Sequence, residues 1–321
     1  MSVDLRTAVG SLELLNPVMT ASGTAGHGAE LASYFDLSRL GAVVVKSLAS
    51  FAWPGNPAPR VAPLPAGMLN AVGLQGPGLS AWARDELPRL APTGARVVVS
   101  IWGRSVEDFA KVGKELAELV APGAAAPFVA VEVNVSCPNL EDRSRIFAHS
   151  PEATAAAVDA VGEAGLPVPL WAKLSPNTAD LVEVAGAALD AGAEGLTLVN
   201  TLLGYFVDLA TRRPVLGAGG GGLSGPALHP VALRAVRDCR VAFPSAGIVG
   251  VGGIGDAEAA LRMLLAGADA VQVGTATLAD PRAPVKVLDG LSAACERYGF
   301  ASVREAVDAL SLGTDALSPG T

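Results

Sequence analysis

Residues that could carry out chemistry recur in this sequence directly after short apolar runs. Lys46 and Lys173 end two such runs, and Cys137 stands in the segment NVSCPN just after the run at 129–134. A buried ammonium group requires a carboxylate partner or an anionic ligand. A thiol in a loop beyond a strand can act as a nucleophile or a general base. These three residues are therefore the first candidates for a functional site.

The two lysines leave two interpretations open. Each could form an ion pair with a neighbouring carboxylate, and Glu132 could serve if its side chain faced inward. We favour a bound anion, because two lysines at the ends of two strands would meet at one mouth of a barrel.

Three asparagines indicate what else such a site would bind. Asn70, Asn134 and Asn200 can each donate and accept hydrogen bonds. Each of them alone could simply cap a loop. Together they favour a planar ligand that carries both amide N–H and C=O groups.

Glycines follow the last two apolar runs. Gly252 and Gly253 end one run, and Gly274 with Thr275 ends the other. Either pair alone would indicate a tight turn, but glycine also lets the backbone approach a ligand closely. Loops in these two places bind phosphate in many barrels, so the two pairs together favour a phosphorylated cofactor.

The other cysteines and the histidines carry weaker signals. Cys239 and Cys295 lie in helical patterns, and we expect both to be small buried residues. His149 could approach Cys137, although we expect it first of all to be a loop residue. No histidine stands in a metal-ligand pattern, so we predict a site without a metal.

Eight apolar runs would position these residues. They lie at 18–21, 42–46, 96–101, 129–134, 169–173, 195–200, 247–251 and 269–274. Helical patterns follow most of them, and the clearest lie at 105–120, 150–165, 177–192 and 256–267. Eight strand–helix units predict an α/β fold of the (β/α)8 TIM-barrel type, with an open doubly wound sheet as the alternative. We expect residues 1–321 to form one domain, in which glycine-rich 217–222 is a loop.

Composition argues against other classes of protein. The formal net charge is -8 with no long run of one sign, whereas a nucleic-acid-binding surface would be basic. Three widely spaced cysteines without a C-x-x-C pair argue against a disulfide scaffold and fit a reducing cytoplasm. The uncharged stretches 61–83 and 214–233 are broken by proline and glycine, so we expect neither to be a membrane helix. The N-terminal residues lack the pattern of a signal peptide.

Taken together, the motifs resemble those of the dihydroorotate dehydrogenases. The likeness runs from NPVMTASGT at 16–24 to VQVGTATLADP at 271–281. The most specific segments are NAVGLQ (70–75), NVSCPN (134–139), WAKLSPNTADL (171–181), LTLVNT (196–201), GGLSGPALHPVALRAV (221–236) and GVGGI (250–254). Six segments in the family's order make the resemblance specific. It implies a flavin-dependent (β/α)8 barrel.

The resemblance implies one FMN at the barrel mouth. Its phosphate would lie on Gly252, Gly253, Gly274 and Thr275, which agrees with the interpretation of the glycine pairs. The other residues that match cofactor positions are Ser22, Lys46, Ser47, Ser100, Asn134, Lys173, Val199 and Gly225.

The resemblance also implies oxidation of (S)-dihydroorotate to orotate, a step of de novo pyrimidine (UMP) biosynthesis. The residues that match the substrate pocket are Lys46, Asn70, Ala71, Val72, Gly73, Leu74, Asn134, Asn139, Asn200 and Thr201. Cys137 matches the catalytic base, which would remove the C5 proton while the C6 hydride passes to FMN.

The electron acceptor follows from the branch of the family. Cysteine as the base is typical of the soluble class, and residues 134–154 are more similar to its NAD-dependent branch. In that branch a second subunit carries FAD and an iron–sulfur cluster, which implies a homodimer or a heterotetramer with such a partner. A fumarate-linked enzyme is the alternative. Gly76 and Ser100 depart from the family, which often has asparagine at these positions.

Three further functions remain open on the sequence. A related flavin barrel could act on another dihydropyrimidine. An aldolase-type barrel could use Lys173 as a Schiff-base lysine and would bind no flavin. A barrel that only supports a partner would leave Cys137 and the lysines without a purpose.

Overall fold

Eight parallel strands form the centre of the protein. The computed structural model describes residues 3–120, 126–136 and 146–311. The central strands are β3 (Val18–Thr20), β4 (Val43–Val44), β7 (Val97–Ile101), β8 (Ala130–Asn134), β9 (Leu170–Lys173), β10 (Gly195–Leu198), β15 (Gly247–Val251) and β16 (Ala270–Val273). All eight lie within the predicted apolar runs. Each strand pairs with its neighbours in the chain, in the order β3-β16-β15-β10-β9-β8-β7-β4.

The sheet closes into a barrel between its first and last strands. A parallel bridge joins Met19 to Ala42, and the Gly41 N–H donates to the Val18 carbonyl at 2.9 Å. Sequential order and closure are the features of a (β/α)8 barrel, so this prediction is confirmed. The open doubly wound sheet is not the architecture of this chain.

Side chains alternate between the inside of the barrel and the surrounding helices. On β7, Val97 and Val99 pack in the cluster that includes the helices, whereas Val98 packs in the interior cluster with Trp171. The same period of two places Ser100 inward, above Val98. This alternation decides which polar residues near the strand ends enter the barrel.

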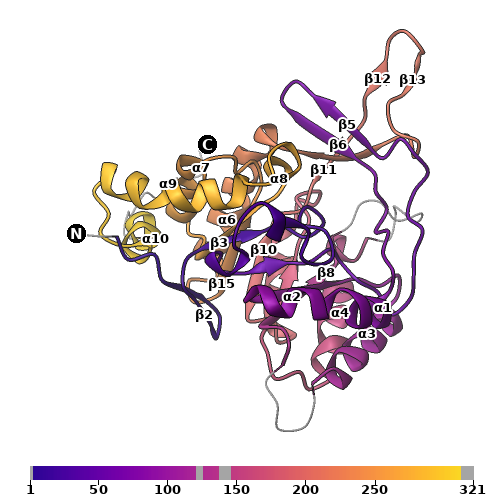
Figure 1. Ribbon diagram of the computed structural model, residues 1–321, viewed down its shortest axis with the longest axis horizontal. Helices are drawn as coiled ribbons and strands as arrows, with labels where there is room; N and C mark the ends of the chain where they lie inside the picture. The colour runs from indigo at the N-terminus through magenta and orange to yellow at the C-terminus, as the bar shows by residue number, and fades with distance from the viewer. Residues whose placement is uncertain (1–2, 121–125, 137–145, 312–321) are drawn as a thin grey trace, which may run out of the picture.

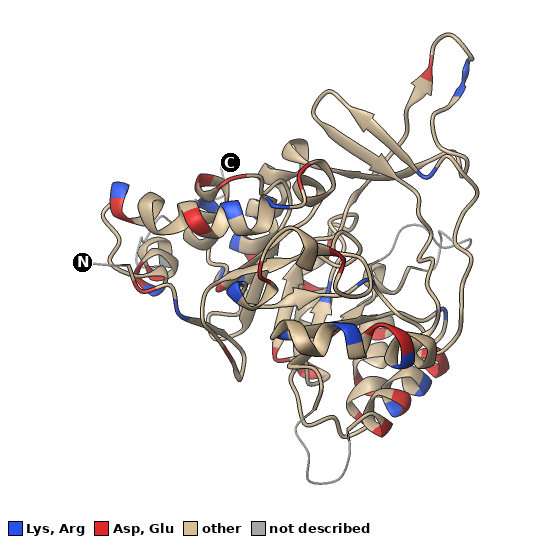
Figure 2. Ribbon diagram, in the orientation of Figure 1, with Lys and Arg blue, Asp and Glu red and all other residues tan. Residues whose placement is uncertain are grey.

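Helices surround the barrel and carry many of the charged residues (Figures 1 and 2). They are α1 (Leu79–Asp85), α2 (Leu87–Leu90), α3 (Val106–Glu118), α4 (Pro151–Gly162), α5 (Leu181–Asp190), α6 (His229–Ala242), α7 (Ala257–Leu265), α8 (Thr275–Ala279), α9 (Ala283–Arg297) and α10 (Val303–Ser311). Short 3-10 helices are η1 (Glu30–Ser33), η2 (Leu37–Arg39), η3 (Ala91–Thr93), η5 (Phe147–His149) and η6 (Pro226–Leu228). Among the described residues, no helix has the length and apolarity needed to cross a membrane.

The helix starts follow from side-chain caps. Ser105 accepts a hydrogen bond from the Asp108 N–H before α3. Ser150 and Asp256 cap α4 and α7 in the same way. Cys239 and Cys295 are buried in α6 and α9, which confirms the expectation for both. Burial raises the pKa of the Cys239 thiol to about 12, so this thiol is inert at neutral pH.

A small hairpin covers the end of the barrel where the strands begin. Its strands are β1 (Thr7–Val9) and β2 (Leu12–Leu14). Val9, Leu12 and Leu14 pack in the interior cluster of the barrel. The hairpin closes that end, so a ligand-binding site is expected at the opposite end, where the strands finish.

A second sheet stands over that opposite end, and the sequence analysis missed it. Its strands are β5 (Val61–Leu64), β6 (Gly67–Asn70), β11 (Leu202–Gly204) and β14 (Gly221–Ser224), in the order β11-β14-β6-β5. A separate hairpin of β12 (Val207–Asp208) and β13 (Arg213–Pro214) projects beside β5 and β6 (Figure 1).

The expectation that 217–222 is entirely a loop was wrong for its last two residues. Gly221 and Gly222 begin β14, between β11 and β6. A Cβ atom on Gly221 would lie 2.4 Å from the Asn70 carbonyl oxygen. These glycines therefore allow strands to pack closely, which a glycine run in a sequence does not reveal.

Candidate active site

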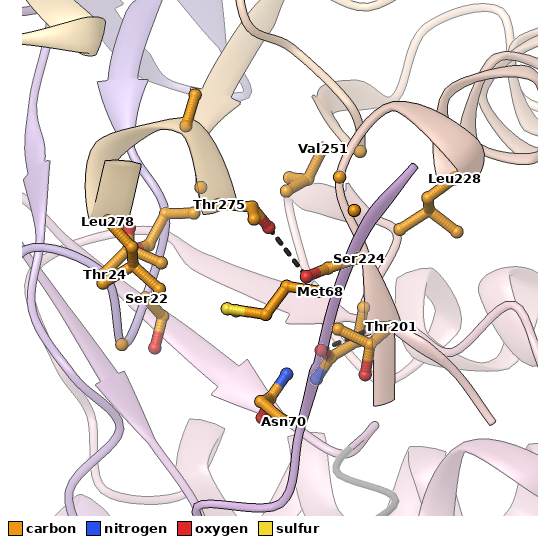
Figure 3. A pocket seen from close by; sticks show the side chains of 18 of the residues that line it. Ser22, Thr24, Met68, Asn70, Thr201, Ser224, Leu228, Val251, Thr275 and Leu278 are labelled. Carbon is orange, nitrogen blue, oxygen red and sulfur yellow. Dashed lines mark hydrogen bonds between the residues drawn. The ribbon is translucent and has the colours of Figure 1, made fainter. Parts of the chain in front are cut away.

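One cavity of about 480 Å³ lies where the barrel strands end (Figure 3). Predicted cofactor residues that line it are Ser22, Lys46, Ser47, Asn134, Lys173, Val199, Gly225, Gly252, Gly253, Gly274 and Thr275. Predicted substrate residues that line it are Lys46, Asn70, Val72, Gly73, Leu74, Asn134, Asn200 and Thr201. The fold thus brings together residues at or just beyond the ends of seven barrel strands and residues of the covering sheet.

Four predicted residues stand apart from that set. Ser100 and Ala71 are fully buried and do not line the cavity. Cys137 and Asn139 lie outside the described residues. Their proposed roles as base and substrate ligand remain predictions.

Glycine loops and two hydroxyl groups form one side of the cavity. Thr275 Oγ1 donates to Ser224 Oγ at 2.7 Å (Figure 3). Gly253 has a φ of +67°, and a Cβ atom there would lie 2.6 Å from His229 Cβ. Gly252 has a φ of +143°. Only glycine meets both the backbone conformation and the close packing at this loop.

Two asparagine amides, linked through serine hydroxyls, form another part of the cavity wall. Asn200 Nδ2 donates to Ser136 Oγ at 3.1 Å, and Ser136 Oγ donates to Asn134 Oδ1 at 2.9 Å. Asn134 Nδ2 donates to Ser47 Oγ at 3.0 Å. This chain of bonds fixes the orientations of two amides, one at the end of β8 and one just beyond β10. Ser136 directly precedes Cys137 in the sequence.

The covering sheet supplies residues that the sequence analysis missed. Met68 extends from β6 toward the cavity, beside the predicted residue Asn70, and Ser224 extends from β14 (Figure 3). Ser224 lies in a segment that carries the resemblance, but nothing in its local pattern marks it as a cavity residue. Its position depends on the strand pairing of Ser224 with Met68.

The sequence left two interpretations open for the lysines, an ion pair or a bound anion, and they apply differently to Lys173 and Lys46. Lys173 Nζ lies 3.4 Å from Glu132 Oε1, and both side chains are buried. The ion-pair alternative therefore describes Lys173, although its side chain also lines the cavity. This pairing opposes a Schiff-base role, which requires a neutral amine. Lys46 lines the cavity on the β4 side. Burial of His27 lowers the pKa of its imidazole, and the positive charge of Lys46 lowers it further.

Metal chemistry finds no support in the described residues. Within 3–120, 126–136 and 146–311, no group of three histidine, cysteine, aspartate or glutamate side chains could hold a metal ion. The charged groups that line the cavity are instead the two lysines.

Comparison with known proteins shows the class to which this fold and cavity belong. The family model described as dihydroorotate dehydrogenase matches residues 4–294. This match covers most of the chain, so the protein belongs to the dihydroorotate dehydrogenase family of oxidoreductases.

Curated relatives place the chain more narrowly within the family. It is 44% identical over 308 residues to the catalytic subunit of dihydroorotate dehydrogenase B (NAD(+)) from Geotalea uraniireducens, with 96% of this chain and 98% of the relative covered. It is 42% identical over 303 residues to the protein of that name from Alkaliphilus metalliredigens, covering 94% and 97%. The corresponding protein from Bacteroides thetaiotaomicron is 40% identical over 309 residues, covering 96% and 99%.

Proposed function

We propose that this protein oxidises (S)-dihydroorotate to orotate with FMN, in the cytoplasm, as a step of pyrimidine biosynthesis. The observation that carries the proposal is the composition of the cavity at the barrel mouth. Amides on one side suit a ring with amide groups, and glycine loops with hydroxyls on the other suit a phosphate. Membership of the family supports the same conclusion.

The cavity fits a flavin in size and chemistry. Its volume of about 480 Å³ lies within the range of about 300–1,000 Å³ that is usual for small-molecule sites. The loop at Gly252 and Gly253, together with Thr275, would hold the phosphate. Val199, Asn134 and Lys173 would hold the ring, and Ser22 and Ser47 would support it.

The reaction removes a proton from C5 and a hydride from C6 of the substrate. Bound FMN would supply the hydride-accepting chemistry. Cys137 would take up the C5 proton as a thiolate, whose ordinary pKa is about 8.5. Asn134 and Ser136 precede it on the chain and are hydrogen-bonded to each other, so the described residues next to the proposed base are held at the cavity.

The remaining polar residues would bind and orient dihydroorotate. Asn70, Asn134, Asn200 and Thr201 would form hydrogen bonds with the ring amides, together with Asn139. The positive charge of Lys46 would attract the substrate carboxylate. Ala71, Val72, Gly73 and Leu74 would shape the loop that closes one side of the pocket.

We further propose that electrons pass to NAD through a partner subunit. The relatives are named catalytic subunits of NAD-linked enzymes, which supports such a partner for this chain. The partner would carry FAD and an iron–sulfur cluster, because this chain has only three widely spaced cysteines. The assembly would be a homodimer alone and a heterotetramer with the partner. A fumarate-linked enzyme is the alternative.

Orotate formation tests the proposed function. The purified protein, supplied with FMN, is given dihydroorotate or dihydrouracil, together with NAD, fumarate, a quinone or an artificial electron acceptor in turn. We expect orotate with an artificial electron acceptor and no direct reduction of NAD by this subunit alone. Turnover of dihydrouracil but not of dihydroorotate would instead assign the barrel to another dihydropyrimidine.

A further inference from the structure

A buried carboxylate below the cavity has no role in the proposed function. Glu132 on β8 is fully buried and does not line the cavity. Its Oε1 accepts from Ser100 Oγ at 3.0 Å and lies 3.4 Å from Lys173 Nζ. Its Oε2 accepts from Gln272 Nε2 at 2.9 Å. Three donors on three other strands therefore converge on one carboxylate.

The geometry places this carboxylate across the inside of the barrel. Ser100 is the register partner of Glu132 on the adjacent strand β7, and Lys173 lies on β9 at the other side. Gln272 lies on β16, which β15, β10 and β9 separate from β8 around the barrel wall. Its hydrogen bond to Glu132 therefore crosses the interior.

Of these four side chains, Lys173 is the one that reaches the cavity. Its side chain is 5% exposed and lines the cavity wall, two register positions above Glu132. A second path runs from Ser100 to Ser47 at 2.9 Å and from Ser47 to Ser22 at 3.0 Å. The carboxylate is thus connected to the cavity wall at two places but does not itself line the cavity.

We propose that Glu132 is a positioning residue that holds the Lys173 ammonium group at the cavity wall and balances its charge. The inference rests on the proposed function in one respect, since the ligand that meets this charge is a flavin. The ion pair is buried, so the attraction is only weakly screened. Without the Glu132 carboxylate, the positive charge of Lys173 would lose the negative charge that balances it, and the ammonium group could shift its position.

The midpoint potential of bound FMN tests the charge balance. Reduction adds negative charge to a flavin, so an unbalanced cation nearby favours the reduced form. At mildly acidic pH, Glu132→Gln should shift the potential to a more positive value. Lys173→Met should shift it to a more negative value, and the double variant should return it toward that of the unchanged protein.

Asp269→Asn is the matched control. Asp269 is also a buried carboxylate paired with a cation, Arg240, at 2.6 Å, but it lies before the start of β16 and not at the cavity. This variant should lose stability and keep the flavin potential. A Glu132→Gln variant that loses stability and keeps the potential, as the control does, would overturn the proposal and leave Glu132 a purely structural role.

A stability comparison without flavin separates this proposal from the proposed function. If the carboxylate serves Lys173, the double variant should unfold at a higher temperature than Glu132→Gln, because it removes both charges together. If Glu132→Gln alone does not fold and the double variant does, the same expectation is met. Equal loss of stability in both variants would overturn the pairing. Failure of the unchanged protein to bind FMN would refute the proposed function and leave this comparison intact.

Discussion

Gly222 on the covering sheet lies directly against Thr201 at the cavity wall. A Cβ atom at position 222 would lie 2.0 Å from Thr201 Oγ1 and 2.6 Å from Thr201 Cβ. Thr201 has little room to move, because its N–H donates to Asn200 Oδ1 at 2.8 Å and its carbonyl accepts from Asn177 Nδ2 at 2.9 Å. The missing side chain of a glycine in one sheet thus determines where a hydroxyl of the barrel loop stands.

Gly222→Ala should therefore damage substrate binding. The new methyl group would displace Thr201, and the KM for dihydroorotate should rise by about tenfold or more while FMN remains bound. Gly162→Ala is the control, because Gly162 ends α4 and a Cβ atom there has ordinary contact with Leu170 at 3.8 Å. Unchanged KM in Gly222→Ala would show that Thr201 does not bind the substrate.

Cys137→Ala should keep FMN bound and lose flavin reduction by dihydroorotate. General-base catalysis contributes about 100- to 10,000-fold, so the rate of reduction should fall within that range at neutral pH. Cys137→Ser should recover activity only as the pH rises, because a hydroxyl is a much weaker acid than a thiol. Stopped-flow absorbance measures both. Loss of bound FMN in Cys137→Ala would instead give Cys137 a structural role.

Lys46→Ala should weaken both ligands together. Lys46 lies two residues beyond β4 and lines the cavity, so its charge would reach the flavin and the substrate carboxylate. We expect the dissociation constant of FMN and the KM for dihydroorotate each to rise by about tenfold. Fluorescence titration and steady-state kinetics measure the two. If neither value changes, Lys46 does not belong to the site.

The buried ion pair at the other end of the barrel should contribute mainly to stability. Asp269 Oδ2 accepts from Arg240 Nη2 at 2.6 Å and from the Ile248 N–H at 2.8 Å. Asp269→Ala should lower the free energy of unfolding by about 3–5 kcal/mol, because Arg240 remains buried without its partner. Urea denaturation measures this loss.

The control for that variant lies on the same helix as Arg240. Asp238 pairs with Arg234 four residues earlier on α6, at the surface. Asp238→Ala should cost at most about 0.5 kcal/mol. Equal losses from the two substitutions would mean that burial does not decide the value of the Asp269 pair.

The barrel was predictable from the sequence because its strands are buried on both faces. Runs such as RVVVSI at 96–101 are nearly continuous in apolar residues, and Ser105 and Ser150 mark the following helix starts. The covering sheet was not predictable, because strands such as β5 and β14 contain proline or glycine and resemble loops. The pairing of β14 with β6 joins residues more than 100 positions apart.

The residues of the site were predictable from the sequence, but the contacts among them were not. Residues at strand ends, such as Asn134 and Thr275, could be assigned to one mouth once the barrel was assumed. Ser100, where the family often has asparagine, is buried below the cavity and donates to Glu132. The bond from Gln272 to Glu132 crosses the barrel, and no sequence pattern brings those two residues together.

The most direct test of the account is anaerobic reduction of the flavin by the substrate. Dihydroorotate is added to the purified protein with bound FMN in the absence of oxygen, and the flavin absorbance is followed. We predict rapid bleaching with formation of one orotate for each FMN. A flavin that stays oxidised under dihydroorotate, in protein that binds FMN tightly, would contradict the proposed substrate.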